Sequence, residues 1–186
     1  KEFFKTVHSA TPTMWGNDSA YTIRSNTNPS NGGAQAWSAT TTVGSSDHSI
    51  TGLYERSGAL YIGWTQYPLY LDSTGAVKSD KAPELAAITS TTSGKNADIW
   101  QDKWYYPAGA QALLEIGTTN TYRNPSSYCT NLPDFIGAVQ AITHDESWLF
   151  VIVDNTTKLE ILKCGNVLVD GIAKWVEHPF HELTLT

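Results

Sequence analysis

Four segments of the 186-residue chain repeat one pattern, in which a polar turn leads into an apolar strand and a second apolar stretch follows. Matching positions in the four strands are Tyr21, Leu60, Trp104 and Leu149, spaced by 39, 44 and 45 residues. In the last three segments the second stretch begins nine or ten residues later. Units of about 40–50 residues that hold several short strands are typical of β-propeller blades.

Each unit reads as an antiparallel meander, because short apolar strands alternate with turns rich in Asn, Asp, Gly and Ser. Helical periodicity is weak, and the best helical candidate, residues 82–88, is short. We therefore predict one all-β, β-propeller-like domain over residues 1–186, with about four meander blades. The blades are placed roughly at 11–46, 47–94, 95–134 and 135–186. A β-sandwich or barrel with evenly spaced hairpins is the alternative.

The chain length fits either a closed four-bladed propeller or a segment of a larger one. Closure would require the two ends to share one blade, for which residues 2–7 and 181–186 are the candidates. The strand near Phe3–Val7 is alternatively the outer strand of a preceding blade. A segment of a larger propeller would expose sheet edges and need a partner chain.

Composition excludes several classes of partner. The net charge is −6 and the 12 lysines and arginines form no basic stripe, so we expect no nucleic acid partner. The longest apolar runs, such as Trp148–Val153, are too short to span a bilayer, so we expect no membrane insertion. A disulfide between Cys129 and Cys164 and a pair of separate thiols are equally compatible with the spacing.

The sequence predicts no catalytic residue, no metal site and no cofactor. Glycoside hydrolysis needs two placed carboxylates. Only Asp98 falls on a predicted inner strand, whereas Asp145 and Glu146 fall in a predicted turn. The other carboxylates considered are Asp154 and Glu160.

The histidines and glycines give no further site. His178 and His181 are only three residues apart, but a zinc site needs three or four converging ligands. The glycine-containing turns lead into no helix that would bind a phosphate.

Two aromatic residues are candidates for contact with a ligand or partner. Trp64 and Tyr67 fall in a predicted loop between strands, where exposed rings stack on sugars or anchor a protein contact. Most of the other tryptophans are expected to pack between blades, since large rings fill the gaps between sheets.

The second half of the chain carries a further pattern. A Trp-turn-aromatic strand ends in Pro107, a loop leads to Gly137, and Trp175 precedes His178-Pro179. Over residues 97–180 this pattern resembles propeller-like proteins from the tail modules of tailed phages and prophages. The matching segments are 98–109, 112–117, 132–142, 148–151 and 175–179. The first unit departs from the pattern because it lacks the Pro-ended strand. The resemblance implies a structural or receptor-contacting virion part and supplies no catalytic residue.

We therefore expect a non-enzymatic structural or interaction protein, a component of a virion (a phage tail or similar) or of an extracellular assembly. Its loops would contact protein partners or a host surface during host attachment. The first alternative is a carbohydrate-binding propeller that binds a host-surface glycan. The second alternative is a glycoside hydrolase.

Overall fold

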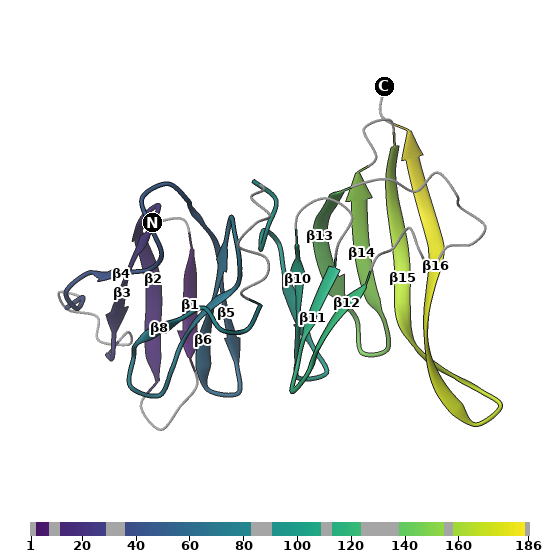
Figure 1. The fold of residues 1–186 in the computed structure, drawn as a ribbon, viewed down its shortest axis with the longest axis horizontal. Helices are drawn as coiled ribbons and strands as arrows, with labels where there is room; N and C mark the ends of the chain where they lie inside the picture. Colours follow the sequence, from purple (N-terminus) through teal and green to yellow (C-terminus); the bar gives the residue numbers. More distant parts are fainter. Residues whose placement is uncertain are drawn as a thin grey trace.

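The structure is a computed structural model that describes residues 3–7, 12–28, 36–82, 91–108, 113–123, 138–154 and 158–184. Within these ranges every regular secondary-structure element is a β-strand. The strands form four antiparallel sheets of four strands each. The strands of every sheet follow one another in chain order, so each sheet is a meander (Figure 1). The all-β prediction is confirmed.

The first sheet contains β1 (Phe4–Val7), β2 (Thr13–Ser19), β3 (Thr22–Asn26) and β4 (Thr41–Thr42). The second contains β5 (Ile50–Arg56), β6 (Ala59–Trp64), β7 (Leu69–Leu71) and β8 (Val77–Lys78). The third contains β9 (Asp98–Trp100), β10 (Lys103–Pro107), β11 (Leu113–Ile116) and β12 (Asn120–Arg123). The fourth contains β13 (Ala138–His144), β14 (Leu149–Asp154), β15 (Lys158–Val169) and β16 (Ile172–Thr184).

Tight turns with left-handed backbone join β5 to β6 and β9 to β10. Gln101 and Asp102, between β9 and β10, have φ of 51° and 56°. Ser57 and Gly58, between β5 and β6, have φ of 50° and 76°. Two consecutive residues with positive φ are the geometry of the type I′ hairpin, whose twist matches that of the flanking strands.

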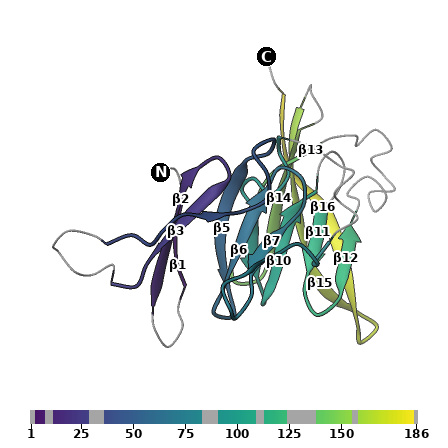
Figure 2. The same cartoon turned by 60° about the vertical axis from the view of Figure 1, so that its left-hand side comes forward.

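The four sheets stand side by side in chain order, with the first and fourth at opposite ends of the row (Figure 1, Figure 2). Neighbouring sheets meet along their first strands, because β1 contacts β5, β5 contacts β9 and β9 contacts β13. A backbone hydrogen bond from Ile142 N to Asn96 O, 2.9 Å long, adds to the junction between the third and fourth sheets.

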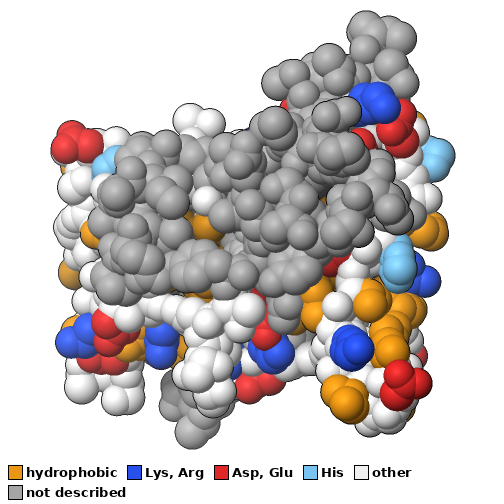
Figure 3. All heavy atoms as spheres, turned by 45° about the vertical axis from the view of Figure 1, so that its right-hand side comes forward, with side chains coloured by type: hydrophobic (Ala, Val, Ile, Leu, Met, Phe, Trp, Pro, Cys, Tyr) orange, Lys and Arg blue, Asp and Glu red, His pale blue; other side chains and the backbone are white. Residues whose placement is uncertain are grey.

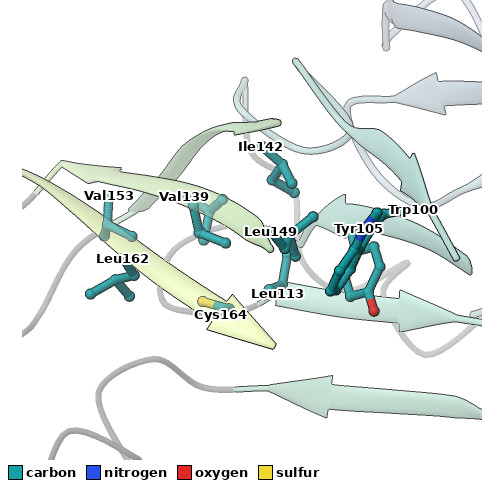
Figure 4. Packing of buried hydrophobic residues seen from close by; sticks show 10 residues of the cluster. Trp100, Tyr105, Leu113, Val139, Ile142, Leu149, Val153, Leu162 and Cys164 are labelled. Carbon is teal, nitrogen blue, oxygen red and sulfur yellow. The ribbon is translucent and has the colours of Figure 1, made fainter. Parts of the chain in front are cut away.

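Apolar side chains fill each of the three spaces between neighbouring sheets. Ile23 of the first sheet packs with Ile62 of the second. Tyr61 lies next to Ile62 in β6 and packs with Trp104 of the third sheet. Tyr105 follows Trp104 and packs with Leu149 of the fourth (Figure 4). Successive side chains of one strand thus point to opposite faces of the sheet, and both faces of each middle sheet are buried.

The ends of the chain differ from the sequence expectations. Strand β1 pairs with β2, from Phe4↔Gly16 to Val7↔Thr13, whereas the C-terminal strand β16 pairs with β15. Residues 2–7 and 181–186 therefore do not share a sheet within the described residues. A return to the nearby β2 closes a much shorter loop than pairing with the distant end would, and it costs less chain entropy.

The repeat is also shifted in the first sheet. Leu60, Trp104 and Leu149 lie in the second strands of their sheets, but Tyr21 precedes β3, the third strand of the first sheet. The aligned pattern was wrong by one strand there, because β1 already belongs to this sheet. The helical candidate at 82–88 falls outside the described residues apart from Ala82.

Within the described residues, no helix has the length and apolar character needed to cross a membrane.

Candidate interaction surface on the fourth sheet

The last two strands extend beyond the rest of their sheet. Strand β14 pairs with β15 only as far as Leu149↔Cys164. Strands β15 and β16 continue together from Gly165↔Val176 to Val169↔Ile172, and the two-residue turn at their tip has φ of 52° at Asp170 and 78° at Gly171. Residues 165–176 therefore form a two-stranded arm, seen at the lower right of Figure 1.

The arm and the strand that follows it carry exposed apolar side chains. Within the described residues, every large hydrophobic side chain classed as exposed belongs to β15 or β16. These side chains are Leu168 (76% exposed), Val169 (37%), Ile172 (63%), Phe180 (61%) and Leu183 (48%). An isolated two-stranded hairpin is marginally stable in water, and exposed apolar patches mark interaction sites.

The exposed apolar residues of β16 lie on a face of the fourth sheet that is apolar at Phe150, Ile152 and Ile161 and also carries Lys163 and Asp154. One face of this sheet packs on the third sheet; we call the other the outer face. Side chains alternate between the two faces along each strand, and this alternation places half-buried residues of β14 and β15 on the outer face. The outer face also includes Phe180, whose ring lies 5.6 Å from that of Phe150. The half-buried apolar residues of this face are Phe150, Ile152, Leu159 and Ile161. Figure 3 shows hydrophobic side chains beside lysine, histidine and acidic groups at this end of the molecule.

Two tryptophans fix the base of the arm from its two sides. A Cβ at Gly165 would lie 2.9 Å from the ring of Trp148, so only glycine lets that ring cover the strand. Lys163 Nζ lies 4.3 Å from the centroid of the same ring. On the opposite side, the ring of Trp175 stacks on buried Tyr105 at 6.1 Å and 16°. The arm is thus held in place at its base while its tip stays exposed.

Trp64 and Tyr67 do not form the exposed aromatic pair predicted from the sequence. Trp64 is the last residue of β6 and is fully buried between the first and second sheets. Gly44, with φ of 68°, lies so close that a Cβ there would be 2.3 Å from the indole ring. Tyr67 is half-buried and packs against the same core. The expectation of an exposed Trp64 is corrected, because the strand runs one residue further and the Gly44 backbone covers the ring.

Two of the carboxylates considered for catalysis, Asp98 and Asp145, have structural contacts. Asp98 Oδ2 lies 2.6 Å from His144 Nδ1, which joins β9 to the end of β13. Asp145 Oδ1 accepts hydrogen bonds from the backbone N–H groups of Ser147 and Trp148, at 2.7 Å each, and these bonds lower the pKa of Asp145. Asp145 therefore closes the β13–β14 turn.

The remaining residues considered from the sequence are two cysteines and two histidines. Cys164 is buried in the core between the third and fourth sheets (Figure 4), whereas Cys129 falls outside the described residues. Their pairing stays a prediction. His178 and His181 are both exposed on β16, and no group of three or more His, Cys, Asp or Glu that could hold a metal occurs within the described residues.

Glu160 lies on the face turned toward the third sheet, opposite Glu182 of β16. Burial, and then the charge of Glu182, raises the pKa of Glu160, while Lys158 opposes the shift. A carboxyl whose folded-state pKa is raised favours folding below its ordinary pKa, and this contribution is lost as the pH rises through the folded value.

We expect Glu160→Gln to raise the free energy of unfolding at pH 7, by less than about 1 kcal/mol because water screens the site in part. At pH 4 this gain in the free energy of unfolding over wild type should be smaller. Urea unfolding at the two pH values measures both. Glu146→Gln, at an exposed turn position, is the control for loss of one charge. A lower stability of Glu160→Gln at pH 7 than at pH 4, each relative to wild type, would show that the charged form is favoured instead.

The sequence does hold a signal for the arm that was missed. Asp170-Gly171 stands between the apolar runs of β15 and β16, and Asp-Gly between such runs is a strong hairpin signal. Comparison with known proteins gave no matching family model, no matching curated protein and no matching solved structure.

Proposed function

We propose that this chain is a non-enzymatic interaction module of a larger protein assembly, and that the outer face of the fourth sheet, with its arm, contacts the partner. The observation that supports this most is the exposure of Leu168 and Ile172 on an arm whose base is fixed. Burial of one such side chain is worth about 1.5–3 kcal/mol. A partner that covers the arm would gain this free energy.

We also propose that the four sheets are successive blades of a β-propeller. The repeat spacing, the four-stranded meanders and the contacts between first strands support this assignment. The row has two end faces, and the outer face of the fourth sheet corresponds to the face of the second or third sheet that the next sheet covers.

The setting of the assembly stays a prediction. A virion or extracellular location rests on the resemblance of residues 97–180 to phage tail proteins. The carbohydrate-binding alternative depended on Trp64 and Tyr67 as exposed loop aromatics. The ring of Trp64 is buried and offers no face to a sugar, and Tyr67 is half-buried against the same core. Protein contact is therefore the function that the exposed surface supports best.

The double variant Leu168→Ser/Ile172→Ser tests this function. Because both side chains are exposed, we expect the free energy of unfolding to change by less than about 0.5 kcal/mol. Binding of the dye 8-anilinonaphthalene-1-sulfonate to the folded chain should fall, since the dye binds exposed apolar surface. Urea unfolding and dye fluorescence, both on dilute protein, provide the two measurements.

Leu114→Ser is the matched control, because Leu114 is fully buried between the second and third sheets. We expect this variant to lose several kcal/mol of stability. If the double variant loses as much as the control does, Leu168 and Ile172 serve the core of the chain itself. Unchanged dye binding in a stable double variant would likewise argue against a docking surface.

A further inference from the structure

We infer that a second copy of this chain covers the outer face of the fourth sheet, and that the two copies form a two-fold symmetric dimer. The inference rests on the proposed function, because it names the partner of the same surface.

The interfaces between sheets inside the chain form a series that continues to the outer face of the fourth sheet. Tyr61 and Tyr70 of the second sheet stack at 5.7 Å, and the third sheet covers them with Trp104. Tyr105 of the third sheet is covered in turn by Leu149 of the fourth. The outer face of the fourth sheet follows in this series, so its natural cover is another apolar sheet face.

The end face of the first sheet of a second copy fits this outer face poorly. The end face of the first sheet carries an ion pair of 3.1 Å between Arg24 Nη2 and Asp18 Oδ2, and Thr6 and Met14 alternate onto the same face as Arg24. Packing this face on an apolar one would desolvate the ion pair, which costs more than it returns. Head-to-tail association is therefore disfavoured, and the outer face of the fourth sheet is left as its own partner.

The charged side chains of the outer face are complementary under a two-fold axis. Lys163 and Lys174 alternate onto the outer face toward the arm, and Asp154 alternates onto it at the opposite end. A two-fold axis that lies in the interface, at right angles to the strands, places the arm end of one copy on the opposite end of the other. Each Asp154 then approaches the lysines of the second copy, as a self-complementary interface requires.

The edge of β16 is a weaker site for association than the face. Strand β16 is the edge of its sheet, and it contains Pro179, which has no backbone N–H to donate. A register shift near Ile161/Leu162 also interrupts its ladder. Proline and bulges oppose edge-to-edge pairing, so face packing is favoured.

The experiment is light scattering of the intact chain behind size exclusion over a series of concentrations. We expect the mass to rise from 20.4 kDa to twice that value. Ile172→Glu and Phe180→Glu should each weaken dimerisation at least about tenfold, because a buried apolar contact is replaced by a charge. Met14→Glu on the end face of the first sheet is the control, and it should dimerise as wild type does.

Each possible result either supports or overturns the two-fold dimer. Loss of the dimer in the two fourth-sheet variants, with the control intact and all variants unfolding cooperatively, supports the inference. Loss in Met14→Glu overturns the two-fold arrangement in favour of head-to-tail contact. A wild-type monomer at every concentration overturns the second copy as partner; the proposed function is then judged by the dye and stability measurements, which need no dimer.

Discussion

Replacement of Trp104 by alanine is expected to lower the free energy of unfolding by about 3–5 kcal/mol. Trp104 is fully buried between the second and third sheets. Its ring meets those of Tyr61 at 5.2 Å and 74° and of Tyr106 at 5.0 Å and 80°, both edge-to-face, and lies 5.4 Å from that of Tyr54. Alanine would leave a cavity that these neighbouring rings of the second and third sheets cannot fill.

This loss is a large share of the total stability, which is about 5–15 kcal/mol for a typical domain. Urea unfolding followed by circular dichroism measures it. Trp104→Phe is the matched variant, because the indole N–H has no hydrogen-bond partner within the described residues and phenylalanine removes it while keeping a ring. We expect this variant to lose clearly less than Trp104→Ala. A loss below about 1 kcal/mol in Trp104→Ala would contradict the close packing of the second and third sheets.

The second large effect is expected from Gly63→Ala, which should lower the free energy of unfolding by about 1–3 kcal/mol. A Cβ at Gly63 would lie 2.6 Å from the backbone oxygen of Gly94 and 2.7 Å from Thr51 Oγ1. The Gly94 oxygen also accepts a hydrogen bond of 2.9 Å from Tyr54 Oη, so it is not free to move away. The extra methyl group must therefore displace the segment that links the second and third sheets.

Gly117→Ala is the control for the loss of a glycine. A Cβ at Gly117 would meet its nearest neighbour at 3.5 Å, an ordinary van der Waals distance, and Gly117 does not have positive φ. Thermal unfolding of the two variants gives the comparison. Equal stability of both would mean that the chain around Gly94 moves without cost.

The sequence predicted the parts of this fold that depend on local pattern. The spacing of Leu60, Trp104 and Leu149 marked the second strands of three sheets, and polar turns marked their hairpins. The first sheet was misaligned, because the anchor Tyr21 resembles the others in sequence but precedes a third strand. The sequence of a single apolar strand does not show which position that strand takes in its sheet.

The contacts between sheets could not be predicted in the same way. Asp98 and His144 are 46 residues apart, and only the stacking of the third and fourth sheets brings them together. The burial of Trp64 depends on the approach of Gly44. The exposure of the arm depends on where β14 stops pairing, at Leu149↔Cys164, and the apolar run of β15 alone suggests a buried strand.

Backbone hydrogen exchange of residues 165–176 tests most directly whether the arm and the outer face of the fourth sheet form a docking surface. In dilute protein the N–H groups of the arm should exchange fast, because no neighbouring strand or sheet protects its tip. In concentrated protein they should become protected, while exchange in β10 should stay the same. The same exchange in the arm at every concentration would contradict docking by a second copy. Strong protection of the arm even at the highest dilution would show that it belongs to the core of the chain itself.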